Sequence, residues 1–190
     1  MSARARALTP QDRRDSLVAA TVPLLREHGR DVTTRQIACA AGVAEGTIFR
    51  VFATKEELLD AAICAALDPE AYVVAVAAVD RTGSLEDLLL RLTRLAQERL
   101  RGIFELMAAI GMVGPPEHVR PHGEWYDRLS ELQEELLAPH ADELRVPVPE
   151  ALHVLRLLTF AGTHAHIAKG RELSAEHIVD LVLNGTRKAP

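Results

Sequence analysis

The histidines and cysteines are the side chains of this sequence best suited to metal binding or nucleophilic attack, and their spacing supports neither role. Cys39 and Cys64 stand alone on predicted helices, without the spacing of a metal site or a redox pair. His164 and His166 are two residues apart on a predicted helix and therefore point to nearly opposite sides. His153 and His164 share a helix face, but eleven residues separate them by about 16 Å, too far for one ion.

The sequence also lacks the motifs of common catalytic sites. It contains no glycine-rich phosphate loop, no serine nucleophile elbow and no His-Glu-x-x-His pair. We therefore expect a protein that is not an enzyme and that binds neither a cofactor nor a metal ion.

A different chemistry, the recognition of nucleic-acid bases, is available between residues 33 and 55, TTRQIACAAGVAEGTIFRVFATK. Arginine can hydrogen-bond guanine in the major groove, glutamine can bond adenine, and glutamate can accept from the amino group of cytosine. The candidates are Arg35, Gln36, Glu45 and Arg50. For each of them, a phosphate contact or plain exposure to solvent is the alternative interpretation.

Two short helices joined by a tight turn are expected to position these side chains. Thr33 or Thr34 can cap the first helix, because its hydroxyl can accept a hydrogen bond from the free amides of the opening turn. Gly42 stands where a helix can end in a left-handed conformation without steric cost. A second helix is predicted from Ala44 to Val51. Such a pair forms a helix-turn-helix unit, whose second helix fits the major groove of DNA.

The pattern TTxxIAxxAGVxxGTxFxxFxxKExL, read from Thr33 to Leu58, resembles the DNA-binding head of the TetR family of bacterial one-component regulators. Twelve positions in this stretch of 26 agree with the family's pattern: Thr34, Ile37, Ala38, Ala41, Gly42, Val43, Gly46, Thr47, Phe52, Lys55, Glu56 and Leu58. The resemblance implies an all-α fold of about nine helices. It places a three-helix DNA-binding domain at residues 1–53 and a helical ligand-binding and dimerisation domain at residues 54–190.

The resemblance also implies roles for individual residues of the head. Thr34 and Thr47 correspond to phosphate-contacting residues, and Gly46 to a position that lies close to the DNA backbone. Lys55 corresponds to a phosphate anchor at the start of the next helix. Phe49 stands where the family more often has tyrosine, so one phosphate hydrogen bond is lost while the packing survives.

Charge is distributed unevenly along the chain. The net charge is −5, but residues 1–55 hold nine Lys or Arg against five Asp or Glu, whereas residues 56–190 hold thirteen against twenty-two. A basic head on an acidic body can present one face to phosphates, although chance asymmetry of a solvated surface would give the same numbers.

Composition indicates a soluble helical protein. Hydrophobic residues make up 48% of the sequence and aromatic residues only 4%, with Ala and Leu dominant, which favours helices. No apolar stretch is long enough to cross a membrane, and the first residues lack the apolar core of a signal peptide. We expect a cytoplasmic protein without a membrane partner.

Apolar residues recur at helical spacing along the rest of the chain. The helices expected around and beyond the helix-turn-helix unit span residues 10–29, 54–67, 69–79, 85–110, 123–144, 150–168 and 174–184. The last two are apolar around nearly their whole circumference, which predicts a twofold dimer through a four-helix bundle. The expected interface residues are Leu158, Ala161, Gly162, Ala165, Ile178, Leu181 and Val182.

The resemblance implies a ligand cavity in the body, but no polar sequence motif indicates its position. Its expected lining is Phe104, Met107, Ile110, Trp125, Tyr126, Leu129, Phe160 and His164. Each of these residues fits an ordinary core position equally well. Such a cavity would suit a small, largely apolar effector.

Together these features predict a DNA-binding transcriptional regulator, in particular a repressor that an effector releases from a near-palindromic operator. Its expected partners are double-stranded DNA, a second copy of the chain and an unidentified small molecule. The alternative is an all-helical small-molecule binding protein or enzyme whose head no longer binds DNA, because Phe49 and Val51 both lack the polar groups common at their positions.

Overall fold

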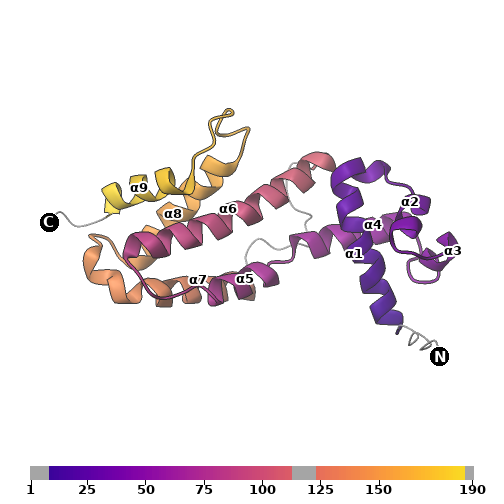
Figure 1. Ribbon diagram of the computed structural model, residues 1–190, viewed down its shortest axis with the longest axis horizontal. Helices are drawn as coiled ribbons and strands as arrows, with labels where there is room; N and C mark the ends of the chain where they lie inside the picture. Colours follow the sequence, from indigo (N-terminus) through magenta and orange to yellow (C-terminus); the bar gives the residue numbers. More distant parts are fainter. Residues whose placement is uncertain (1–8, 113–122, 187–190) are drawn as a thin grey trace, which may run out of the picture. The chain divides into compact units, whose positions relative to one another are not determined.

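The structure is a computed structural model that describes residues 9–112 and 123–186. Within these ranges the chain forms nine α-helices and two 3₁₀ helices and no strand (Figure 1), which confirms the predicted all-α fold.

Eleven helical elements follow one another along the described part of the chain. They are α1 (Pro10–His28), η1 (Gly29–Asp31), α2 (Thr34–Ala40), α3 (Glu45–Ile48), α4 (Lys55–Leu67), α5 (Glu70–Ala77), α6 (Leu85–Ala109), α7 (Glu124–Leu137), η2 (Ala138–Glu143), α8 (Val148–Thr163) and α9 (Ala175–Thr186).

The chain divides into two compact units. The head unit comprises Met1–Asp68 with Glu105–Val119, and the body unit comprises Pro69–Phe104 with Arg120–Pro190. Helix α6 therefore contributes its first twenty residues to the body unit and its last turn to the head unit. Helix α4 belongs to the head unit, whereas the boundary predicted between residues 53 and 54 would assign it to the body; that functional boundary stays a prediction.

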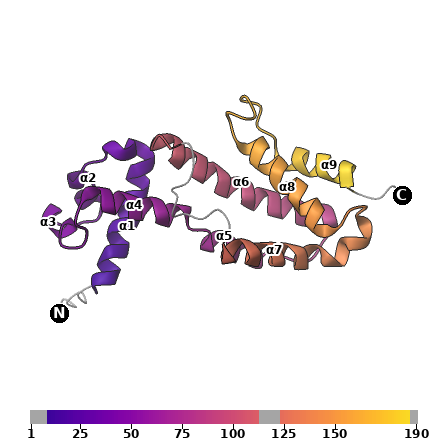
Figure 2. The same ribbon diagram turned by 180° about the vertical axis from the view of Figure 1, so that it is seen from behind.

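In the head unit, α1 packs against α2 and α4, and α2 packs against α3, as the views from opposite sides in Figures 1 and 2 show. Full burial of one large apolar side chain stabilises a fold by about 1.5–3 kcal/mol. The large side chains that are at most 2% exposed here are Leu17, Leu25, Ile37, Ile48, Phe52, Leu58, Leu59 and Ile63.

Helix α1 begins as its sequence predicts. The Thr9 hydroxyl accepts a hydrogen bond from the Asp12 amide, and the Asp12 carboxylate accepts one from the Thr9 amide, both at 3.1 Å. These bonds from Thr9 lower the pKa of Asp12. Pro10 occupies the first turn, where its missing amide hydrogen costs nothing.

In the body unit, α7 packs against α5 and α8, and α8 packs against α9. The α6 helix opens with a capping box, in which the Ser84 hydroxyl accepts from the Asp87 amide and the Asp87 carboxylate accepts from the Ser84 amide. The buried cluster includes Val73, Val76, Leu85, Leu89, Leu92, Leu136, Leu137, Leu152, Ile178, Val179 and Val182.

Two helices are shorter in the structure than the sequence predicts. The helix expected over residues 44–51 is α-helical only at Glu45–Ile48 and continues as a turn, and Ala44 gives its first turn no side-chain cap. The helix expected over residues 123–144 leaves the α conformation at Leu137, because Pro139 has no amide hydrogen to continue the ladder.

Helix α8 ends at Thr163 rather than at the predicted residue 168, because residues distant in sequence bond to its end. The Leu173 amide donates to the Gly162 carbonyl (2.9 Å), and the Gln97 amide group donates to the Leu173 carbonyl (2.8 Å). These bonds fold the chain back across the end of α8. His164 and His166 therefore lie beyond the helix, and the prediction that one helix carries both was wrong.

No helix in the described part of the chain combines the length and the apolar character needed to cross a membrane.

Replacing Gly29 by alanine should destabilise the head unit more than the same change at Gly42. Both glycines have positive φ, 59° and 66°, so each variant incurs the strain of about 1–2 kcal/mol for a left-handed side chain. Only at Gly29 would the new Cβ overlap backbone, the carbonyl oxygen of Ala109; nothing lies within 4 Å at Gly42. We expect the two losses to differ by at least about 1 kcal/mol in denaturant unfolding followed by circular dichroism. Equal losses would contradict the close approach at Gly29.

Candidate nucleic-acid interface

The recognition segment, which we define as residues 44–52, is short and is held in place by side chains buried in the head core. Its amides bond carbonyls three or four residues back, from Thr47 to Ala44 (2.8 Å) and from Phe52 to Ile48 (2.9 Å). Ile48 and Phe52 are 0% and 1% exposed and anchor the segment in the head core. A helix this short is not stable alone in water, so its orientation depends on these anchors.

Helix α2 carries a reciprocal cap, formed by Thr33. The Thr33 hydroxyl accepts from the Gln36 amide (3.2 Å), and the Gln36 side-chain oxygen accepts from the Thr33 amide (2.8 Å). The amide oxygen of Gln36, a predicted adenine contact, is thus engaged within the protein.

A second hydrogen bond joins the two helices of the unit. The Thr34 hydroxyl donates to the carboxylate of Glu45, which is the first residue of α3. The two residues were predicted to contact a phosphate and a base separately, and the structure brings them together. In this arrangement the Glu45 charge lies next to a hydroxyl expected to meet phosphate.

The remaining predicted contacts are accessible. Arg35 and Arg50 are exposed, Thr47 is half-buried, and neither arginine makes an ion pair within the described residues. Gly46 is exposed and has no neighbour that a Cβ would meet within 4 Å. Phe49 is 52% exposed, which is unusual for an aromatic ring with no hydrogen-bonding group.

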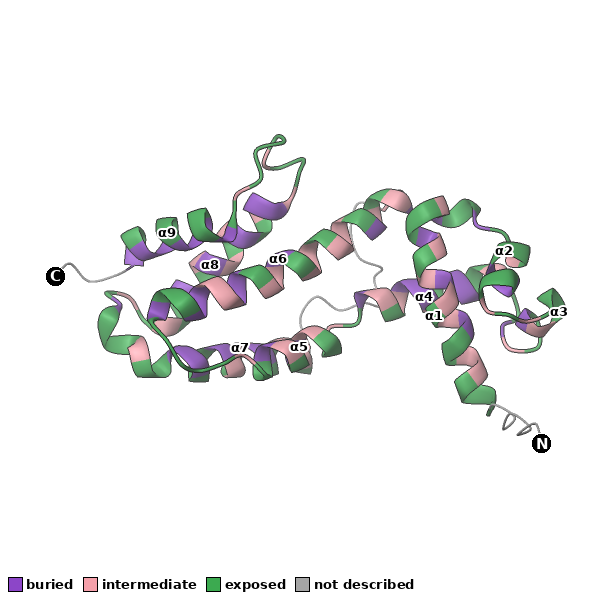
Figure 3. Cartoon of the chain, viewed as in Figure 1, coloured by how far each residue is buried: buried purple, intermediate pink, exposed green. Residues whose placement is uncertain are grey.

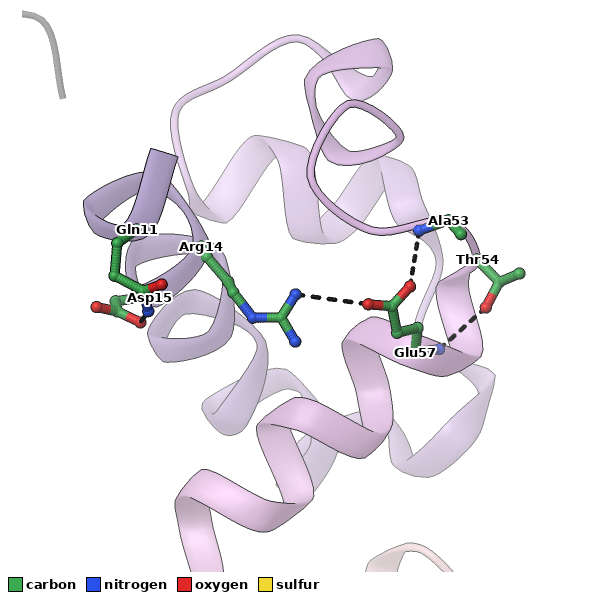
Figure 4. Close-up of polar contacts among 6 residues, drawn as sticks. All are labelled: Gln11, Arg14, Asp15, Ala53, Thr54 and Glu57. Atoms are coloured by element: carbon green, nitrogen blue, oxygen red, sulfur yellow. Dashed lines mark hydrogen bonds and ion pairs between the residues drawn. The ribbon is translucent and has the colours of Figure 1, made fainter. Parts of the chain in front are cut away.

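Glu57 joins the end of the recognition segment to α1 and α4 (Figure 4). Its carboxylate accepts a hydrogen bond from the Ala53 amide (2.8 Å) and lies 3.5 Å from the Arg14 guanidinium, while its own amide donates to the Thr54 hydroxyl (3.0 Å). The Arg14 guanidinium also lies 4.2 Å from the centre of the Phe52 ring. Sequence reasoning overlooked this group, although Thr54-x-x-Glu57 has the spacing of a capping box.

Lys55, the predicted phosphate anchor, also has a partner inside the head. Its ammonium group donates to the Arg30 carbonyl (2.9 Å), and the Arg30 side chain lies 3.3 Å from Asp60. These contacts tie the start of α4 to η1 and fix the position of the Lys55 charge.

Comparison with known proteins identifies this arrangement. Residues 17–62 match the family described as bacterial regulatory proteins, tetR family. The match spans 46 of the 190 residues, so the similarity to the TetR family is shown for the helix-turn-helix head. The matched range includes most of α1, the whole helix-turn-helix unit and the first half of α4. The head is accordingly that of a DNA-binding transcriptional regulator.

Solved structures extend the likeness in fold to the body. A TetR-family transcriptional regulator from Streptomyces coelicolor is 20% identical with a TM-score of 0.60, over 93% of this chain and 80% of that one. A transcriptional regulator from Rhodococcus sp. Rha1 is 18% identical with a TM-score of 0.59, over 93% and 99%. A second Streptomyces coelicolor TetR regulator is 24% identical with a TM-score of 0.50, over 93% and 99%. At these identities the likeness shows the fold alone.

The residues predicted to line a ligand cavity fall into separate groups. Phe104, Phe160 and His164 contact one another, with ring centres 4.5–6.0 Å apart. Trp125 and Tyr126 form an edge-to-face pair at 5.8 Å. Leu129 is buried in the body core, whereas Met107 and Ile110 belong to the head unit.

Three of the predicted interface residues are buried within a single chain. Ile178 and Val182 lie in the body core, and Gly162 packs against Leu173, whose side chain is 3.1 Å from where a Cβ would stand. Leu158 and Ala161 are half-buried, while Ala165 and Leu181 are exposed. Figure 3 shows buried and exposed residues alternating along α8 and α9. When a helix is apolar on every side, its sequence does not show which side packs against its own chain and which side is left for a second copy.

Within the described residues, no group of three or more His, Cys, Asp or Glu is placed to hold a metal ion.

Glu57→Ala should loosen the recognition segment, whereas Glu56→Ala should not. Both changes remove an acidic residue from the first turn of α4, so the loss of the helix-dipole contribution is matched. Only Glu57 holds the Ala53 amide and Arg14. We expect Glu57→Ala to cost about 1 kcal/mol more in unfolding free energy and to speed hydrogen exchange at the Ala53 amide. Unchanged exchange at Ala53 would show that this contact does not hold the segment.

Proposed function

We propose that the protein is a repressor that binds a near-palindromic operator as a twofold dimer and is released by a small effector bound in its body. The observation that carries the DNA-binding part is the exposure of Arg35 and Arg50 on a helix-turn-helix unit whose recognition segment is anchored by buried Ile48 and Phe52. Exposed guanidinium groups can bond phosphate or guanine without first breaking an ion pair.

Base recognition is assigned to a smaller set of residues than the sequence suggests. Arg35 and Arg50 are the direct readers in this proposal, because the carboxylate of Glu45 and the amide oxygen of Gln36 are already engaged. Thr34, Thr47 and Lys55 serve as backbone contacts, which position the head without reading sequence. Phe49 offers an apolar face that can meet the methyl group of thymine.

The proposed dimer uses exposed apolar residues of the body unit. Leu157 and Phe160 on α8 are 57% and 45% exposed, and Leu181 on α9 is 44% exposed. Exposed apolar side chains of this size on two helices that pack together support an interface with a second copy. In this proposal Leu157 and Phe160 join Leu181 in the interface, and the buried Gly162, Ile178 and Val182 are removed from the predicted interface residues. Leu158, Ala161 and Ala165 stay as candidates at its edge.

In the proposed mechanism an effector favours one of two conformations of the dimer. A ligand shifts such an equilibrium only by its difference in affinity for the two states. The low-affinity state for DNA would set the heads away from the spacing of successive major grooves, about 34 Å. Phe104, Phe160 and His164 are candidates to contact the effector.

Selection of bound fragments from a pool of genomic duplexes tests the operator. We expect one or a few near-palindromic sites to be retained at about 150 mM salt, because specific binding outlasts phosphate binding as salt rises. Failure to retain any duplex at low salt would favour the alternative, a body that binds small molecules beneath an inactive head. The Thr34–Glu45 bond is the feature that keeps this alternative open.

Lys55→Gln should weaken DNA binding without changing sequence preference. A phosphate contact contributes equally to operator and random duplex, so both affinities should fall by a similar factor, and the slope of log affinity against log salt should decrease by about 1. Lys169→Gln, in the body unit, is the matched control and should leave both affinities unchanged. A larger loss on operator than on random duplex would assign Lys55 to base recognition instead.

Leu181→Glu should dissociate the dimer, whereas Val74→Glu should not. Both residues are exposed apolar side chains of the body unit, at 44% and 57%, but only Leu181 lies in the proposed interface. A buried unpaired carboxylate opposes association strongly. Sedimentation equilibrium measures the effect, and a dimer that persists in Leu181→Glu would place the interface elsewhere.

A further inference from the structure

A cluster of arginine and tyrosine side chains lies in the body unit, where four helices contribute to it. Tyr72 comes from α5, Arg99 from α6, Tyr126 and Gln133 from α7, and Arg156 from α8. The Arg99 guanidinium carbon is 5.5 Å from the centre of the Tyr72 ring, and that of Arg156 is 5.6 Å from the centre of the Tyr126 ring. We call these five residues the arginine–tyrosine cluster.

The cluster contains a buried hydrogen-bond acceptor that the protein does not satisfy. Gln133 is 4% exposed, and its side-chain oxygen has no hydrogen-bond partner among the described residues. A buried amide oxygen without a donor costs about 1–3 kcal/mol, so such groups are uncommon outside sites that bind something. The function described above gives Gln133 no role.

Two guanidinium groups of the cluster lie near one tyrosine hydroxyl. Burial raises the pKa of the Tyr72 hydroxyl, while the nearby Arg99 and Arg156 charges and the Gln133 side chain lower it. Both guanidinium groups therefore act on this one hydroxyl. The contrast with the rest of the sequence is clear, because residues 56–190 carry thirteen basic residues against twenty-two acidic ones.

Arg156 differs from four other arginines of the body unit. Arg81, Arg94, Arg101 and Arg128 each lie within 4.0 Å of a glutamate carboxylate. Arg156 is half-buried and makes no ion pair with any described carboxylate. Its cation–π contact with Tyr126 supplies about 0.5–2 kcal/mol, which compensates only part of the hydration lost on burial.

A purely structural role explains the ring contacts but leaves both the Arg156 charge and the Gln133 oxygen uncompensated. One ligand chemistry satisfies both. A carboxylate matches the planar donors of arginine and accepts from a tyrosine hydroxyl, and a neighbouring hydroxyl or N–H group donates to an amide oxygen.

We propose that the arginine–tyrosine cluster binds the carboxylate of a small organic acid that also carries a hydrogen-bond donor. Arg156, with Arg99 and Tyr72, holds the carboxylate, and Gln133 accepts from the donor. The Trp125 and Tyr126 rings offer apolar contact for the rest of the molecule. That this acid is the effector rests on the proposed function. It places the effector at this cluster in place of Phe104, Phe160 and His164, and it makes the effector an amphipathic anion rather than a largely apolar molecule.

The test uses the full-length protein without DNA and three acids. Acetate supplies a carboxylate without a donor, and 4-hydroxybenzoate and 3-hydroxyoctanoate add a donor on a ring and on a chain. The methyl esters of the latter two serve as neutral counterparts. Trp125 is the only tryptophan, so its fluorescence reports on this region directly. We expect a saturable fluorescence change and a raised melting temperature with at least one hydroxy acid at constant ionic strength, and neither with its ester. No response to any acid, or equal responses to acid and ester, would overturn the proposal.

Variants separate the site from a general effect of anions. Arg156→Gln should weaken binding of the acid by about tenfold or more, because it removes charged hydrogen bonds. Arg94→Gln, which breaks the exposed pair with Glu176, should leave binding within about twofold of the parent. Gln133→Met should abolish the preference for a hydroxy acid over the same acid without its hydroxyl.

Melting temperatures of the ligand-free variants show whether each variant is folded. If Arg156→Gln is unfolded, Arg156→Lys replaces it and is expected to bind with intermediate affinity. Parent-like binding by the folded Arg156 variant would overturn the proposal.

The two proposals fail in distinguishable ways. Binding of the acid is measured without DNA, so a head that binds no operator would leave the site intact. Binding of the acid without release of a bound operator would uphold the site and contradict its role as the effector site.

Discussion

The recognition segment contains only one turn of α-helix, and a helix of that length cannot maintain its own geometry in water. Contacts with the rest of the head unit compensate for this constraint. Ile48 and Phe52 fix the segment from beneath, the Thr34 bond to Glu45 fixes its beginning, and Glu57 holds the Ala53 amide at its end. The segment can therefore present Arg50 and Thr47 in a defined orientation, although its own hydrogen bonds are few.

The same contacts that order the head reduce what it can recognise. Thr34, Gln36, Glu45 and Lys55 each have a partner within the protein, so each would have to share or exchange that partner on DNA. Arg35 and Arg50 have no such competition within the described residues. The chemistry of recognition is thus expected to concentrate on two guanidinium groups and on the shape of the surface around them, a narrower interface than the list of polar residues implies.

In the body unit the decisive contacts are polar groups inside an apolar bundle. Gln97 bonds Thr163 and the Leu173 carbonyl and thereby ends α8. Gln133 is equally buried but leaves its oxygen unpaired, close to the two cations of the arginine–tyrosine cluster. Within one helical bundle, a satisfied glutamine serves the fold, and an unsatisfied one points to a ligand. This difference motivates a carboxylate-binding site where apolar periodicity alone indicated only core.

The sequence by itself determined the type of the DNA-binding head, the helical class and the caps. These depend on residues close together in the chain: Thr9 with Asp12, Ser84 with Asp87 and Gly42 at a left-handed turn. It could not determine where α8 ends, which sides of α8 and α9 are buried, or which predicted base contacts are already engaged. Those outcomes depend on Leu173 meeting Gly162, on Ile178 and Val182 turning inward, and on Thr34 meeting Glu45. Each joins residues whose proximity no local pattern encodes, and so only the tertiary structure decided them.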